Sequence, residues 1–95
     1  MTWRQIAQAF IALFPELKDN SLFNSNVRLD GQLTHDGFRI FFDNSYVGLY
    51  ENKDRILQEF YNHRSNEHVV EDVSPEHRGH AHEILNEALK LLLGN

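Results

Sequence analysis

Histidine and carboxylate side chains gather in the C-terminal third of the sequence. Residues 66–87 contain six carboxylates and a single basic residue, Arg78. Four of the six histidines of the chain fall within fifteen consecutive positions, at His68, His77, His80 and His82. Imidazole rings beside carboxylates are suited to divalent-metal binding, to proton transfer or to pH sensing.

The spacing of these residues selects one candidate metal set. A helix through this stretch places His77 and His80 about 60° apart around its axis, close enough to share one ion. Glu83 follows His80 by one helical turn and can add a carboxylate ligand. His77, His80 and Glu83 therefore predict a divalent-metal site, and with it a metal-dependent or histidine-based enzyme as the alternative function. The favoured interpretation is a solvated helix start without a cofactor, because the chain has no cysteine to complete a ligand set.

Familiar catalytic patterns are missing from the sequence. It contains no cysteine nucleophile, no Gly-x-Ser-x-Gly segment and no glycine-rich phosphate loop. The net charge of −5 argues against a nucleic-acid partner, because nothing supplies the basic surface that phosphates require. No apolar run approaches the ~18 residues that would span a bilayer, and the first residues lack the pattern of a secretory signal. We expect a non-catalytic, cytoplasmic protein that binds neither nucleic acid nor membrane.

The acidic segment favours another kind of partner. Carboxylates concentrated on one part of a small protein complement a basic surface on a second protein. We therefore expect an acidic protein-interaction module, acting as an adaptor, regulator or inhibitor, with Glu71, Asp72 and Glu76 among its contact residues.

Apolar residues exceed what a small core requires. In the last helix they spread over about 200° of the circumference, whereas packing on one sheet face needs closer to 100–140°. Leu91 and Leu93 extend this apolar arc, and Phe41 alternates onto the strand face opposite Phe38 and Phe42. These surplus residues predict a contact with a second protein or with a second copy of the chain, as a homodimer.

The elements that must position these residues begin with a helix. Thr2 and Gln5 have the spacing of a capping box, and apolar residues recur at helical spacing from Trp3 to Phe14. Pro15 disfavours helical geometry in the residue before it, so we expect a helix over 3–14.

Alternating residues then predict three strands, over 27–33, 38–43 and 46–50. Asp36-Gly37 and Asn44-Ser45 provide the turns between them. A turn at Asp30-Gly31, which would split the first strand, is the second interpretation.

Two further helices are expected. Asn52 can cap one in which Ile56, Leu57, Phe60 and Tyr61 form an apolar stripe, followed by a polar connection over 64–73. Ser74-Pro75 starts the other, which runs to Leu93 and stops at Gly94. The sequence thus predicts one α+β domain over 1–95: an N-terminal helix, a three-stranded antiparallel meander and two C-terminal helices packed on the sheet.

Overall fold

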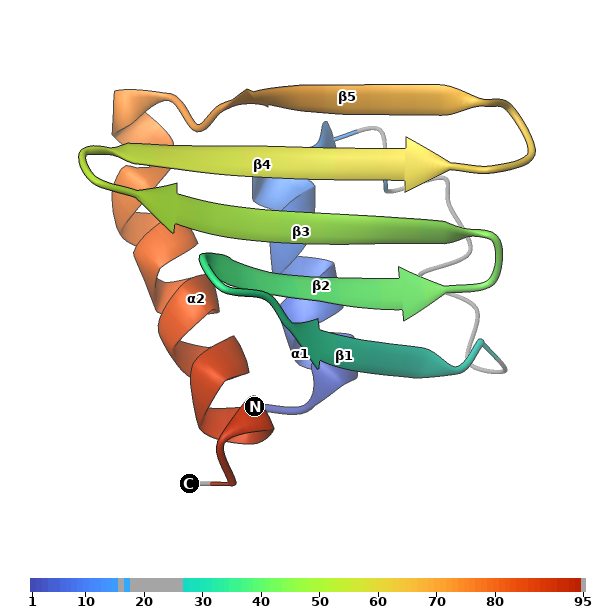
Figure 1. The fold of residues 1–95 in the computed structure, drawn as a ribbon, viewed down its shortest axis with the longest axis horizontal. Helices are drawn as coiled ribbons and strands as arrows, with labels where there is room; N and C mark the ends of the chain where they lie inside the picture. Colours follow the sequence, from blue (N-terminus) through green and yellow to red (C-terminus); the bar gives the residue numbers. More distant parts are fainter. Residues whose placement is uncertain (16, 18–26, 95) are drawn as a thin grey trace.

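The computed structural model describes residues 1–15, 17 and 27–94. Five antiparallel strands form one sheet in which the spatial order follows the chain order. Both α-helices, α1 (Trp3–Ala9) and α2 (Arg78–Leu92), pack on the same face of this sheet (Figure 1). The strands are β1 (Leu29–Leu33), β2 (Gly37–Phe42), β3 (Ser45–Asn52), β4 (Arg55–Asn62) and β5 (Glu67–Asp72). The fold is therefore α+β, as the sequence predicts.

The N-terminal helix begins at the predicted capping box. Thr2 Oγ1 accepts the backbone N–H of Gln5 at 3.1 Å, and Gln5 Oε1 accepts the backbone N–H of Thr2 at 2.8 Å. The regular helix ends at Ala9 and continues as a tighter 3-10 turn, η1 (Phe10–Ala12), before Pro15. The helical structure thus ends at Ala12 instead of the predicted Phe14, and its last turn is a 3-10 turn instead of α-helix.

The predicted second helix is wrong, because the segment after Asn52 is strand β4. This strand pairs with β3 over eight residues, from Asn52↔Arg55 to Ser45↔Asn62. Ile56 and Phe60 are one helical turn apart, but they also share one face of a strand, so the apolar pattern fits both structures. Lys53 has a φ of 58° in the tight turn that joins β3 to β4. A lysine in the sequence does not indicate this left-handed turn conformation, which glycine and asparagine adopt most often.

The polar connection predicted over 64–73 contains the fifth strand. β5 pairs with β4 from Asn62↔Glu67 to Leu57↔Asp72, and Asn66, with a φ of 57°, lies in the turn between them. The sheet therefore has five strands instead of three, and one helix follows it instead of two. β5 is an edge strand of the sheet, and five of its six residues are exposed, which explains why its sequence has the composition of a loop.

The last helix lies close to its predicted bounds, although Ser74 makes no side-chain capping hydrogen bond and the helix ends at Leu92, one residue before the predicted Leu93. It begins with a 3-10 turn, η4 (Pro75–His77), passes into α2, and is followed by Gly94 with a φ of 75°. No helix among the described residues is long and apolar enough to cross a membrane.

The strand β1 runs unbroken through Asp30 and Gly31, so the alternative turn is not formed. The turn between β1 and β2 is centred on His35 and Asp36, and Gly37 already belongs to β2. A Cβ atom on Gly37 would lie 1.9 Å from the carbonyl oxygen of Leu49, so glycine is required here for close strand approach rather than for turning.

The hydrophobic core lies between the helices and one sheet face. Each fully buried large side chain stabilises the fold by about 1.5–3 kcal/mol relative to exposure. The largest of these side chains are Phe10, Phe14, Phe38, Phe42, Ile6, Leu17, Ile40, Leu49 and Val47. The opposite face, here called the open face, is covered by neither helix (Figure 1).

Candidate functional site

A row of rings crosses four strands of the open face. The strand register aligns Phe41 of β2, Tyr46 of β3, Tyr61 of β4 and His68 of β5. Successive ring centroids are 5.4, 5.4 and 5.6 Å apart, within the range of favourable aromatic contacts. We call these four residues the aromatic ladder. The first three are half-buried and His68 is exposed, so the ladder presents apolar surface to solvent.

The next row of residues on the open face, beside the aromatic ladder, has a glycine in its centre, and the side chain of Tyr50 occupies the space above it. Gly48 is flanked by Arg39 on β2 and Glu59 on β4. A Cβ atom on Gly48 would lie 2.4 Å from the hydroxyl oxygen of Tyr50. The absence of a side chain at Gly48 therefore lets the Tyr50 ring lean over the strand toward Glu59.

A polar network is centred on the carboxylate of Glu59, whose side chain is only 8% exposed. It accepts hydrogen bonds from the hydroxyl of Tyr50 at 2.5 Å, from Nε2 of His68 at 2.6 Å and from the hydroxyl of Tyr46 at 3.1 Å. Arg39 Nε donates to the Tyr50 hydroxyl at 2.6 Å, and its guanidinium lies 4.9 Å from the centre of the Tyr46 ring. We call these five residues the Glu59 cluster.

The cluster keeps its carboxylate charged. Burial alone opposes ionisation of Glu59, but the hydrogen bonds from Tyr50, His68 and Tyr46 and the charge of Arg39 outweigh it, so the pKa is lowered. Burial and the adjacent carboxylate raise the pKa of Tyr50 well above its usual value. Because a general acid or base works best with a pKa near the operating pH, these two opposite shifts favour a fixed structural network over proton transfer.

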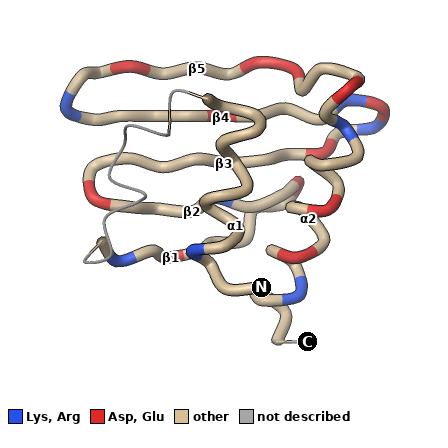
Figure 2. The backbone as a smooth tube through the Cα atoms, turned by 180° about the vertical axis from the view of Figure 1, so that it is seen from behind, with Lys and Arg blue, Asp and Glu red and all other residues tan. Residues whose placement is uncertain are grey.

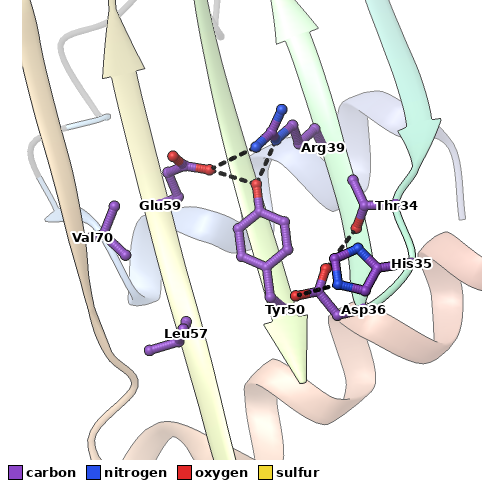
Figure 3. A pocket seen from close by; sticks show the side chains of 8 residues that line it. All are labelled: Thr34, His35, Asp36, Arg39, Tyr50, Leu57, Glu59 and Val70. Atoms are coloured by element: carbon purple, nitrogen blue, oxygen red, sulfur yellow. Dashed lines mark hydrogen bonds and ion pairs between the residues drawn. The ribbon is translucent and has the colours of Figure 1, made fainter. Parts of the chain in front are cut away.

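An open pocket of about 460 Å³ lies beside this cluster on the open face (Figure 3). Tyr50 occupies its middle, Leu57 and Val70 form one side, and Asp36 forms the other. The carbonyl oxygen of Asp36 accepts the backbone N–H of Glu51 at 2.7 Å. This bond fixes the turn between β1 and β2 against β3, so the position of Asp36 beside Tyr50 is part of the fold.

The predicted acidic contact residues do not share one surface. Glu71 and Asp72 are consecutive in β5, so their side chains point to opposite sheet faces. Glu71 accepts a hydrogen bond from Gln58 Nε2 at 2.7 Å, whereas both carboxylate oxygens of Asp72 bind Arg55. Glu76 lies in η4. Acidic residues do recur along β5, as Figure 2 shows from the opposite side of the molecule.

The predicted apolar contact residues also lie apart. Phe41 belongs to the aromatic ladder on the open face. Leu91 and Leu93 are 38% and 62% exposed at the C-terminal end of α2, which packs on the other side of the sheet. The structure therefore offers two apolar surfaces instead of one.

Both histidines of the predicted metal set have hydrogen-bond partners. His77 Nδ1 lies 2.9 Å from Ser74 Oγ. Nε2 of His80 donates to the carbonyl oxygen of Ala9 at 2.8 Å, which ties α2 to the end of α1. Glu83 lies along the groove between these helices with His80. Within residues 1–15, 17 and 27–94, no three His, Asp or Glu side chains come together as a metal-binding group.

The sequence interpretation missed the Glu59 cluster entirely. Placing Glu59 on a helix removed it from the sheet that brings it to Tyr50. The sequence does contain one indication of it, since Tyr46, Gly48 and Tyr50 alternate with the apolar residues Val47 and Leu49 and therefore share one face of the strand.

Neither a protein-family model, nor a curated protein, nor a solved structure matches the chain.

Proposed function

We propose that the chain is a non-catalytic module that binds another protein through the open face of its sheet. The main support for this proposal is that both helices pack on one face of the sheet and leave the aromatic ladder on the other face in contact with solvent (Figure 1). Tyrosine and phenylalanine are enriched in protein contact surfaces, where a rigid ring buries a large area at low cost in conformational entropy.

The internal pairing of the Glu59 cluster supports a binding role. Glu59 already accepts three hydrogen bonds, and the Tyr50 hydroxyl both accepts one and donates one. A cluster whose hydrogen-bonding groups are satisfied in this way is a rigid platform, which lowers the entropic cost of association.

The charge distribution favours a basic protein over a nucleic acid. Four arginines of the sheet and its turns are each neutralised by a nearby carboxylate, and the chain as a whole carries −5. The pairs are Arg28–Asp30, Arg39–Glu59, Arg55–Asp72 and Arg64–Asp43. The phosphates of a nucleic acid would have to compete with these carboxylates for the arginines. A basic protein surface would instead be attracted by the net negative charge of the chain. The proposal places the protein in the cytoplasm, as the sequence leads us to expect.

Site-specific photo-crosslinking in the cells that produce the protein tests this proposal. A benzophenone-bearing phenylalanine analogue replaces Tyr61 in the aromatic ladder, and in a matched control it replaces Glu83, which is exposed on α2. We expect a discrete crosslinked polypeptide from position 61 and none from position 83. Crosslinks from position 83 alone, or from neither position, would contradict a contact through the open face.

A further inference from the structure

We propose that the pocket beside Tyr50 receives a lysine or arginine side chain of the partner protein. This inference rests on the proposed function, because it names the chemistry that the open face would recognise. Three features of the pocket support it: an excess of negative charge, an anchored carboxylate with spare acceptor capacity, and an apolar wall of suitable length.

The charges around the pocket do not cancel. Asp36 and Glu59 contribute two carboxylates, and Arg39 contributes one guanidinium. Arg39 is already engaged, because its Nε donates to Tyr50 and its Nη2 lies 3.6 Å from Glu59. The remaining unit of negative charge attracts a cation and opposes a carboxylate or phosphate at the same place.

Asp36 is the group that can bind the cation. Its carboxylate accepts a hydrogen bond from Thr34 Oγ1 at 3.1 Å and lies 3.8 Å from His35, a residue whose side chain is 93% exposed. An ionised carboxylate can accept about four hydrogen bonds, so Asp36, which lines the pocket, retains capacity for a further donor. Glu59, in contrast, already accepts three hydrogen bonds, from Tyr50, Tyr46 and His68, and is also paired with Arg39.

The opposite wall suits the methylene stem of a long basic side chain. Leu57 is half-buried, and Val70 is 53% exposed although it lies in a sheet. Tyr50 is only 8% exposed, and the guanidinium of Arg39 already lies 5.7 Å from the centre of its ring, so Leu57 and Val70 supply most of the apolar surface for a basic side chain. A lysine or arginine would bury its stem here while its charged end reaches Asp36.

An NMR titration of the full chain with small probes tests the pocket directly. The probes are N-acetyl-lysine N-methylamide and its uncharged analogue, N-acetyl-norleucine N-methylamide. We expect the lysine probe to give saturable shifts at Asp36, Tyr50, Leu57 and Val70, and the norleucine probe to bind at least fivefold more weakly. Equal binding of the two probes, or preferential shifts with acetate or inorganic phosphate, would overturn the proposal.

Matched variants assign the effect to one carboxylate. Asp36→Asn keeps an acceptor for Thr34 but removes the charge, and should weaken the lysine probe about fivefold, as expected for one partly exposed ion pair. Asp43→Asn makes the same change in the turn after β2, outside the pocket, and should leave the probe's affinity unchanged. An equal loss of affinity for the lysine probe in both variants would mean that the probe responds only to net charge, and would contradict specific binding in the pocket.

The photo-crosslink from position 61 separates this inference from the proposed function. If the crosslink forms in the wild-type chain and is lost in Asp36→Asn, both are supported. If it forms equally in both chains and the lysine probe fails to bind, the pocket assignment is wrong and the open-face contact stands. If it never forms, the proposed function fails, and the assignment of a partner side chain to the pocket fails with it.

Discussion

The hydroxyl of Tyr50 and the carboxylate of Glu59 lie 2.5 Å apart across strands β3 and β4, although the two residues are not register partners. Tyr50 is opposite Leu57, and Glu59 is opposite Gly48, so the hydrogen bond runs diagonally across the sheet. Arg39 donates to the same hydroxyl from β2. One phenol thereby connects three strands on the face that the helices leave open.

Removing the charge of Glu59 should destabilise the fold. In Glu59→Gln the amide cannot replace a carboxylate that accepts from Tyr50, Tyr46 and His68, and Arg39 loses its counter-charge. We expect the free energy of unfolding to fall by roughly 2 kcal/mol, the typical cost of leaving buried polar groups unsatisfied. Urea denaturation measures this, with the exposed Glu67→Gln as a control that should change stability by less than about 0.5 kcal/mol. Similar losses in the two variants would contradict a special role for Glu59.

The contribution of Glu59 should depend on pH with a definite sign. Its pKa is lower in the folded chain than in the unfolded chain, so the ionised group stabilises the fold above the unfolded value of about 4.3. This contribution is lost as the pH falls through the lower, folded pKa. We expect the stability difference between wild type and Glu59→Gln to hold steady near neutral pH and to shrink in acid. A series of urea midpoints from about pH 7 to pH 3 measures it, and a gap that widens in acid would contradict the assignment.

Tyr50 should resist ionisation in the folded protein. Burial and the neighbouring carboxylate raise its pKa, so its neutral form stabilises the fold below the unfolded value of about 10, and that contribution is lost as the pH rises through the folded pKa. The phenolate absorbance of wild type and Tyr50→Phe should therefore coincide up to about pH 11 while both remain folded. A lower phenolate yield in the variant near pH 10 would show that Tyr50 titrates as an ordinary phenol.

Gly48→Ala should displace Tyr50, because the new Cβ would lie 2.4 Å from its hydroxyl oxygen. We expect a loss of about 1–3 kcal/mol, the usual cost of overpacking. In a Tyr50→Ala background the same substitution should cost much less, since the clashing ring is gone. Gly79→Ala serves as a control in α2, where the added methyl meets nothing within 4 Å and should stabilise the helix by up to about 1 kcal/mol. An unchanged cost of Gly48→Ala without the Tyr50 ring would place its origin in the backbone.

Self-association is expected through the exposed end of α2. Leu91 and Leu93 are the apolar residues of this helix that remain most exposed, and burying them against a second copy would remove that surface from water. The double variant Leu91→Lys/Leu93→Lys should sediment as a folded monomer, whereas the wild type should show a dimer that dissociates on dilution. Wild-type protein that sediments as a monomer at high concentration would exclude this contact.

Local chemistry in the sequence determined both ends of the fold. Thr2 and Gln5 define the first helix because capping needs only residues within one turn. Pro75 and Gly94 bound the last helix through equally local effects, the fixed φ of proline at the first turn and the positive φ of glycine after the last, although Ser74 makes no side-chain capping hydrogen bond. The strands β1 to β3 were also predictable, because apolar and polar residues alternate in them and the residues that favour turns lie only a few positions away in the sequence.

Only the tertiary structure decided β4, β5 and the candidate site. Ile56, Leu57, Phe60 and Tyr61 fit the apolar stripe of a helix, and on a strand Gln58 and Glu59 interrupt the apolar residues of both faces. The strand therefore forms because of its hydrogen bonds to β3 and its packing in the sheet. The stability of a strand depends on the neighbouring strands that it pairs with, and a local sequence pattern does not reveal those neighbours. Glu59 reaches Tyr50, and Asp36 reaches the edge of the same pocket, because pairing places β2, β3 and β4 side by side. The sequence alone thus determined the elements with local signals, whereas the sheet's register determined the site.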